Sequence, residues 1–168
     1  MLLTPPYAVF IGDATDPLGL KMACSIAYWR PELCVGEIAL PSCTTTAGLP
    51  KVSLDEAVNK GAKSFVLGFN NAGGHIDEKY LPEIKNAIAA GLDIINGLHD
   101  KLTDIPELVA LSEQYNVRLI DIRHPTTRFK IGNGQKRTGK RLLTVGTDCS
   151  VGKMYSTLAI HKEMQQQG

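Results

Sequence analysis

A β-loop-α unit is predicted by Tyr7-Ala8-Val9-Phe10-Ile11-Gly12-Asp13-Ala14-Thr15-Asp16-Pro17. The short apolar run from Tyr7 predicts a strand that ends at Gly12. The residues from Asp13 to Pro17 combine turn formers, a helix cap and a proline suited to a first helical turn. The helix should run to about Trp29, because Pro31 cannot continue it. A strand that leads directly into a helix is the repeating unit of α/β folds.

The same alternation continues along the chain. Further strands are predicted at Leu33–Leu40, Ser64–Gly68, Leu92–Asn96 and Val117–Ile122. Helices are predicted after the capping box of Ser53 and Glu56, from about Lys79 to Ala90, and from Asp104 to about Tyr115. We therefore expect an α/β fold: a Rossmann-like parallel sheet of about five strands with helices on both faces. The G-x-G-x-x-G fingerprint is absent after the first strand, so NAD is not supported.

Polar residues and glycines follow the predicted strands, at the edge where ligands of such sheets gather. We predict substrate binding by Asn70, Gly73, Gly74, Asp121 and Arg123. Asp121 and Arg123 are two residues apart, which places them on one face of a strand, and mutual pairing is the alternative to ligand binding.

His99 is the candidate catalytic base, because it follows a strand and Asp100 is available to orient its imidazole. A loop histidine bonded to the backbone is the alternative. His75 follows Gly73-Gly74, a pair that commonly marks a simple turn.

A phosphate-binding loop is predicted at Gly146-Thr147-Asp148-Cys149-Ser150-Val151-Gly152-Lys153. It lies between the apolar run 142–145, which we expect to form a strand, and a helix-like segment, so the three together form the first β-loop-α unit of a truncated P-loop domain. Glycines let successive N–H groups face one centre, and Lys153 adds a full positive charge. The predicted phosphate-binding residues are Gly146, Thr147, Asp148, Cys149, Ser150, Val151, Gly152, Lys153 and Met154. An ordinary strand-to-helix turn is the alternative.

Met154 stands where the Walker pattern has Ser or Thr, and five residues instead of four separate Gly146 from Gly152. A thioether is a poor ligand for magnesium. Either magnesium is held by other groups, such as Thr147 or Asp148, or the phosphates need no metal, like the pyrophosphate of coenzyme A. No metal-ligating residue is predicted.

Composition restricts the class of protein. The 168 residues are 43% hydrophobic and 21% charged, with a net charge of +1, as in a globular protein without a preference for charged partners. No apolar run approaches the roughly 20 residues of a membrane span, and we expect a cytoplasmic protein without a membrane partner. The four cysteines are too widely spaced for a CxxC metal pair, so reduced thiols are expected.

Seven Lys or Arg and no Asp or Glu occur from Arg123 to Arg141. We interpret residues 126–140 as a basic linker between a Rossmann-like domain, 1–125, and the start of a P-loop domain, 141–168. Nucleic-acid binding is not expected, because Phe129 is the linker's only aromatic residue and stacking needs more.

Several segments together resemble the D-glutamate N-acetyltransferase family, two-domain bacterial proteins long catalogued as a domain of unknown function. They are 70–75, 89–99, 121–123 and 145–154. The form Gly-Thr-Asp-x-x-Val-Gly-Lys is also similar to the loop of dethiobiotin synthetase. The resemblance implies an N-terminal Rossmann-like domain and a C-terminal P-loop domain. It covers nearly the whole chain but only the first part of the family's length, so we expect a fragment that is inactive by itself.

The resemblance also implies acetyl transfer from acetyl-CoA to the amine of D-glutamate, a small-molecule substrate. His99 would take the proton, and Arg123 would hold a carboxylate. The alternatives are an ATP-dependent ligase or kinase of the dethiobiotin synthetase type, with magnesium, and a non-enzymatic module that binds a nucleotide or small ligand. A homo-oligomer of this protein is one of the possibilities that the sequence leaves open.

Overall fold

The computed structural model describes residues 2–124, 131, 133–136, 138–148 and 151–168. The chain divides into two compact units, Met1–Thr127 and Arg128–Gly168. The predicted domain limits at residues 125 and 140 stay predictions. No helix among the described residues is both long enough and apolar enough to cross a bilayer.

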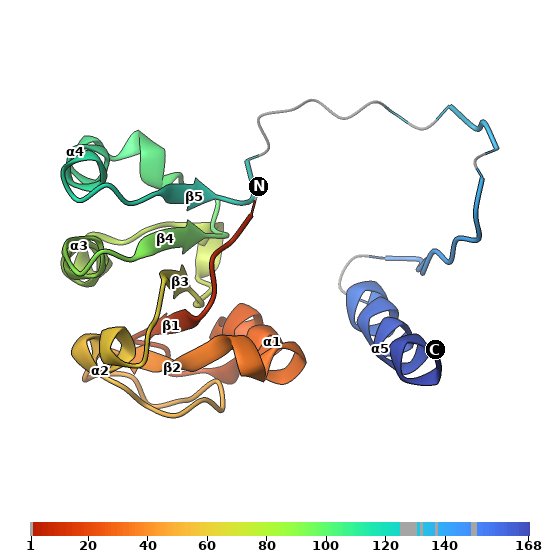
Figure 1. Cartoon of the computed structure of the whole chain (residues 1–168), viewed down its shortest axis with the longest axis horizontal. Helices are drawn as coiled ribbons and strands as arrows, with labels where there is room; N and C mark the ends of the chain where they lie inside the picture. The colour runs from red at the N-terminus through yellow and green to blue at the C-terminus, as the bar shows by residue number, and fades with distance from the viewer. Residues whose placement is uncertain (1, 125–130, 132, 137, 149–150) are drawn as a thin grey trace. The chain divides into compact units, whose positions relative to one another are not determined.

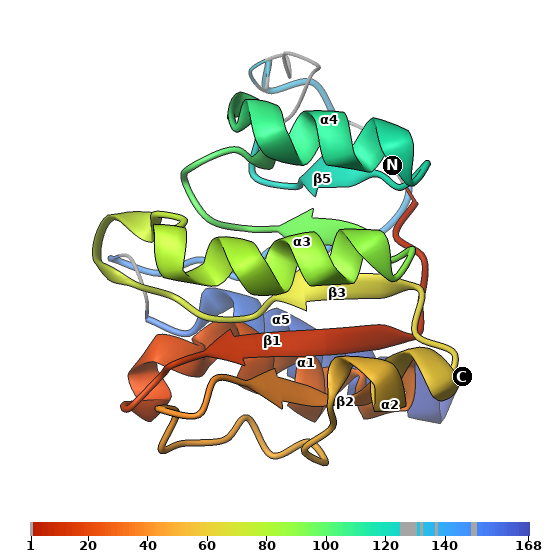
Figure 2. The same ribbon diagram turned by 90° about the vertical axis from the view of Figure 1, so that its left-hand side faces the viewer.

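The first unit is built on a five-stranded parallel sheet (Figures 1 and 2). Its strands are β1 (Tyr7–Gly12), β2 (Cys34–Ala39), β3 (Ser64–Leu67), β4 (Asp93–Asn96) and β5 (Leu119–Asp121). Their order in the sheet is β2-β1-β3-β4-β5. This is a doubly wound order, in which the chain moves outward in both directions from a switch point between β1 and β3. The predicted Rossmann-like sheet is confirmed.

Helices cover both faces of the sheet. They are α1 (Lys21–Trp29), α2 (Leu54–Asn59), α3 (Leu81–Ala89) and α4 (Pro106–Gln114). Helix α1 lies on one face, and α2, α3 and α4 lie on the other (Figure 1). Short 3-10 turns are η1 (Pro17–Leu20), η2 (Pro31–Leu33), η3 (Ala72–Gly74), η4 (Glu78–Tyr80) and η5 (Leu102–Asp104).

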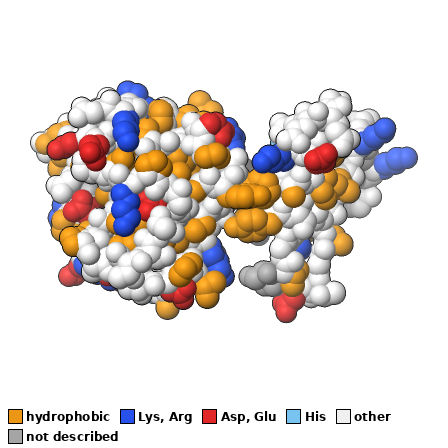
Figure 3. Space-filling model, turned by 90° about the horizontal axis from the view of Figure 1, so that it is seen from below, with side chains coloured by type: hydrophobic (Ala, Val, Ile, Leu, Met, Phe, Trp, Pro, Cys, Tyr) orange, Lys and Arg blue, Asp and Glu red, His pale blue; other side chains and the backbone are white. Residues whose placement is uncertain are grey.

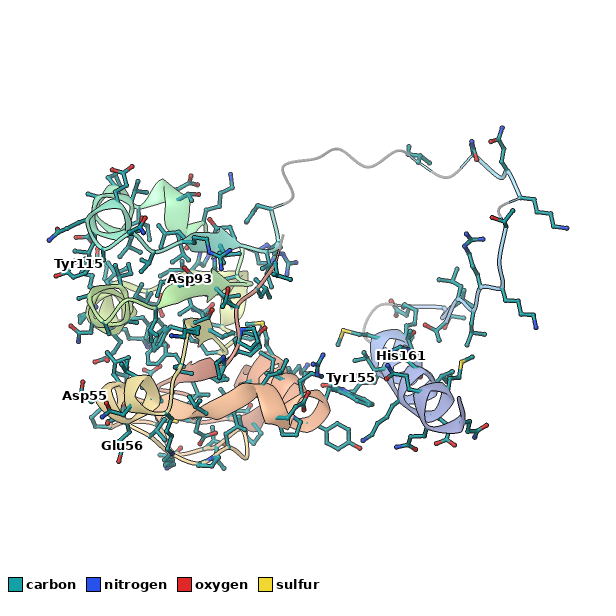
Figure 4. All side chains as sticks on the ribbon, in the orientation of Figure 1. Asp55, Glu56, Asp93, Tyr115, Tyr155 and His161 are labelled. Atoms are coloured by element: carbon teal, nitrogen blue, oxygen red, sulfur yellow. The ribbon has the colours of Figure 1, made fainter. Side chains whose placement is uncertain are left out.

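The predicted capping box begins α2. The Glu56 amide donates to Ser53 Oγ at 3.1 Å, and the Ser53 amide donates to Glu56 Oε2 at 2.7 Å. Both backbone donors would otherwise lack a partner at the helix start. Glu56 is labelled beside α2 in Figure 4.

The main core is aromatic near the end of β1. Phe10 stacks on Phe65 at a centroid distance of 5.2 Å, and it meets Phe69 and Tyr80 edge-on at 5.9 and 5.8 Å. All four side chains are buried. Burying a large apolar side chain contributes about 1.5–3 kcal/mol, so this cluster anchors both loops that follow β1 and β3. Acidic and basic side chains are interspersed over the face of this unit seen in Figure 3.

The predicted limits of the fifth strand differ from the structure. The fifth strand was expected to reach Ile122, but it ends at Asp121, because the His124 amide donates to the Asp121 carbonyl at 3.2 Å and closes a turn. Arg123 lies in that turn. The alternation that placed Asp121 and Arg123 on one strand face therefore does not apply.

The second unit contains α5 (Lys153–Gln167), whose described side chains are not buried. The apolar run 142–145, predicted as a strand, forms no strand. Leu142, Leu143 and Val145 are 67–81% exposed. A strand needs a hydrogen-bonded neighbour, and the described residues of this unit provide none.

Candidate functional site

A cavity of about 380 Å³ lies at the switch point of the sheet. Its walls come from residues 13–16 and Gly19 after β1, residues 69–71 after β3, and Asp77, Lys79 and Tyr80 ahead of α3. Ligands of doubly wound sheets bind at this place, where neighbouring loops leave the sheet in opposite directions. The cavity is therefore the candidate ligand site of the first unit.

Asp13 is the central charge of this cavity. Its two carboxylate oxygens accept from Lys79 Nζ at 2.7 Å and from Tyr80 Oη at 2.5 Å. These hydrogen bonds from Lys79 and Tyr80 lower the pKa of Asp13. Burial, and then the bond to Asp13, raise the pKa of Tyr80 to about 12. Asp13 is thus an anion and Tyr80 a neutral donor at physiological pH.

Asp13 directly follows the first predicted strand, but Lys79 and Tyr80 were not among the predicted site residues. They lie more than 60 residues away in sequence, immediately before α3. No local pattern marks them, because only the parallel pairing of β1 with β3 brings the two loops together.

Among the predicted substrate-binding residues, Asn70 lines the cavity. Its amide donates to the Gly19 carbonyl at 2.6 Å, and its Oδ1 accepts from the Met22 amide at 3.4 Å. These bonds tie the loop after β3 to the start of α1. A role for Asn70 in substrate binding stays a prediction.

Gly73 and Gly74 have positive φ angles of 83° and 66°. A Cβ on Gly73 would lie 2.5 Å from His75 Nε2, and one on Gly74 would lie 2.3 Å from His99 Cδ2. Glycine is therefore required here by backbone conformation and by two closely packed imidazoles. Ligand contact by either glycine stays a prediction.

The carboxylate expected to orient His99 binds His75 instead. His75 Nδ1 lies 3.1 and 3.2 Å from the two oxygens of Asp100. His99 is exposed, and its imidazole has no hydrogen-bond partner within the described part of the chain. Its backbone is held, because its amide donates to the Gly74 carbonyl at 2.8 Å and its carbonyl accepts from His124 Nε2 at 2.9 Å. His99 as the catalytic base stays a prediction.

Asp121 is engaged within the protein. Oδ1 accepts from Asn96 Nδ2 at 2.8 Å and from the Leu102 amide at 3.0 Å, and Oδ2 accepts from the hydroxyl and amide of Thr103 at 3.0 and 3.3 Å. Arg123 is exposed beyond β5 and does not pair with Asp121 in any described contact. Asp121 therefore fixes the loop that follows β4. Substrate binding by Asp121 and Arg123 stays a prediction.

The predicted phosphate loop leads into α5. Gly152, with a φ of 89°, precedes the helix, and a Cβ on Gly146 would lie 2.6 Å from Val151 Cγ2. Lys153 Nζ donates to the Asp148 carbonyl at 2.5 Å, so the ammonium closes the loop. Cys149 and Ser150 lie outside the described residues. Phosphate binding by Gly146, Thr147, Asp148, Val151, Gly152, Lys153 and Met154 stays a prediction.

The hydroxyl of Thr157 is not a substitute for the missing Walker hydroxyl. It donates to the Lys153 carbonyl at 2.9 Å and lies 2.5 Å from Thr144 Oγ1. Met154, at the Walker position, is 59% exposed. Among the described residues, no group of three or more His, Cys, Asp or Glu side chains forms a metal cluster.

The comparison with protein families matches both units. The model of the N-terminal Rossmann-like domain of DUF1611, a domain of unknown function, matches residues 34–125, which is more than half of the chain. This chain belongs to the DUF1611 family. The model of the family's C-terminal P-loop domain matches residues 130–168. The predicted family resemblance and combination of domains are confirmed.

Two curated relatives of this DUF1611 chain are called D-glutamate N-acetyltransferase. The protein of Pseudoalteromonas sp is 59% identical and that of Tritonibacter scottomollicae is 45% identical, each over 167 residues. The alignments cover 99% of this chain and 50% of each relative, so the chain spans about half their length. A crystal structure of a DUF1611 protein from Anabaena variabilis is 28% identical, with a TM-score of 0.78, over 98% of this chain and 51% of that one.

Proposed function

We propose that this chain forms the N-terminal part of an N-acetyltransferase that transfers acetyl from acetyl-CoA to the amine of D-glutamate. The observation that carries this proposal is the 59% identity, along 99% of the chain, to a protein of that name. Because the alignment covers half of that relative, the activity is proposed for a polypeptide that contains this chain.

The two units supply two kinds of binding group for this reaction. In the second unit, Lys153 and the loop ahead of α5 suit the phosphates of coenzyme A. Met154 suits a phosphate site that uses no magnesium. In the first unit, the switch-point cavity has charges of both signs, Lys79 against Asp13 and Asp77. An amino acid with one ammonium and two carboxylates needs charges of both signs.

The test is thermal unfolding of the protein that contains this chain, with acetyl-CoA or with Mg-ATP. A ligand at about 100 times its Kd stabilises the native state by about 2.7 kcal/mol. We expect acetyl-CoA to raise the Tm and Lys153→Ala to abolish the rise. Lys60→Ala, which removes an exposed charge of the first unit, should leave the rise intact.

Release of the coenzyme A thiol, measured with D-glutamate and then with L-glutamate, tests the reaction itself. Thiol release that depends on D-glutamate supports the transferase. A Tm rise with Mg-ATP alone would favour the ligase or kinase instead. No rise with either ligand would favour a non-enzymatic module.

A further inference from the structure

We propose that His75, oriented by Asp100, is the base that takes the proton from the ammonium group of the acceptor amino acid. This inference rests on the proposed acetyl transfer. It assigns to the loop after β3 a catalytic site for a primary amine.

The geometry of the pair defines which ring nitrogen is free. His75 Nδ1 lies within 3.2 Å of both oxygens of Asp100, and Oδ2 also accepts from the Ile76 amide at 2.9 Å. The Ile76 N–H and then His75 lower the pKa of Asp100, so this carboxyl group is an anion. A carboxylate can only accept, so Nδ1 carries the hydrogen and neutral His75 has its lone pair on Nε2. This is the orientation of a histidine general base.

The pair is anchored to the sheet. The Asp100 carbonyl accepts from Nδ2 of Asn96 at 2.7 Å, and Asn96 is fully buried at the end of β4. The Asp100 amide donates to the Gly74 carbonyl at 3.2 Å. The end of β4 and the turn η3 therefore hold the backbone of Asp100, which is the support that the partner of a catalytic group needs.

The same loop connects the backbone of His75 to a residue that lines the cavity. Asn71, which lines the cavity, accepts from the His75 amide through Oδ1 and donates to the His75 carbonyl through Nδ2, both at 2.9 Å. The side chain of His75 is 62% exposed, so it is accessible to a substrate. The absence of a side chain at Gly73 lets the imidazole pack against that residue, because a Cβ there would lie 2.5 Å from Nε2.

The reaction balances with these groups. Nε2 takes one proton from the ammonium, and the amine nitrogen attacks the carbonyl carbon of the acetyl thioester. As the C–N bond forms and the C–S bond breaks, coenzyme A leaves as a thiolate. The new amide nitrogen gives its second proton to the thiolate, and His75 later releases its proton to water.

The test measures kcat with acetyl-CoA and D-glutamate in the protein that contains this chain. A general base contributes about 100- to 10,000-fold, so we expect His75→Gln to lower kcat at least about 100-fold while the Tm rise with acetyl-CoA remains. Asp100→Asn should also lower kcat. His161→Gln is the matched control, because His161 is exposed on α5 (Figure 4) and should not change kcat.

One further variant separates catalysis from folding. His75→Gly should regain activity when imidazole is added, which a merely structural histidine would not do.

The outcomes distinguish the two proposals. Full kcat in His75→Gln, loss in His99→Gln only, or no rescue of His75→Gly by imidazole would overturn the role of His75. Wild-type protein that forms no acetylated product would instead contradict the transferase itself.

Discussion

Tyr80 donates its phenolic hydrogen to Asp13 at 2.5 Å across 67 residues of sequence. The bond joins the end of β1 to the turn that precedes α3 at the wall of the switch-point cavity. The bond holds a neutral phenol against the Asp13 carboxylate, which also forms an ion pair with Lys79. A contact between two loops that are distant in sequence therefore fixes the position of the Asp13 carboxylate in the cavity wall.

Tyr80 makes the folded state sensitive to alkaline pH. Its pKa is raised to about 12 in the folded chain, against about 10 in an unfolded one. The stabilisation is complete below about pH 10 and is lost as pH rises to about 12, a change of about 2–3 kcal/mol. Urea unfolding at about pH 9 and about pH 12 measures this loss. It should shrink in Tyr80→Phe and persist in Tyr115→Phe; equal losses in both variants would contradict the assignment.

Asn96 is expected to be a stability determinant. It is fully buried, and it binds the Leu98 amide, the Asp100 carbonyl and Asp121 at 2.7–2.9 Å. Asn96→Ala removes the acceptor of the Leu98 amide and one donor each from the Asp100 carbonyl and Asp121, and it should lower the free energy of unfolding by about 2–3 kcal/mol. The exposed Asn59→Ala should change it by less than about 0.5 kcal/mol. Equal effects in denaturant titrations would argue against the network.

The buried side chain of Glu37 fixes the loop that follows β2. Its buried carboxylate accepts from the Thr46 hydroxyl at 2.7 Å and from the Ala47 and Leu49 amides at 2.8 and 3.3 Å. Glu37→Met leaves both amides without an acceptor and should cost about 2–3 kcal/mol.

Glu37→Gln is the matched variant. Its oxygen can still accept from both amides while its NH₂ group donates to Thr46 Oγ1, so we expect a loss below about 1 kcal/mol. If chemical denaturation shows Gln to be as harmful as Met, the charge itself matters and the hydrogen-bond explanation is wrong.

Substitution of Gly74 by Ala is expected to destabilise the protein both by a steric clash and by an unfavourable backbone conformation. Gly74→Ala places a Cβ 2.3 Å from the His99 ring and 3.0 Å from the His99 amide, at a φ of 66°. We expect a loss of about 2–3 kcal/mol. Gly61 has a φ of 84° with open space around it, so Gly61→Ala should cost only about 1 kcal/mol. Similar decreases in Tm for Gly74→Ala and Gly61→Ala would show that the clash with His99 does not contribute.

The parallel sheet was predictable because its signals are local. An apolar run such as Tyr7–Ile11 marks a strand by itself, and the spacing of Ser53 and Glu56 marks a helix start. The predicted strand at 142–145 failed for the complementary reason, since a strand forms only with a neighbour to accept its hydrogen bonds.

In the first unit, the amino-acid sequence alone determined which segments become strands and helices, because these properties depend on neighbours a few residues apart. In the second unit it determined that a glycine-rich turn with Lys153 begins the last helix. Only the tertiary structure decided that Asp100 forms its imidazole hydrogen bond with His75 instead of His99, and that Lys79 and Tyr80 contact Asp13. Those partners come from loops after different strands, and the order of strands in the sheet, which no short stretch encodes, places them within hydrogen-bond distance.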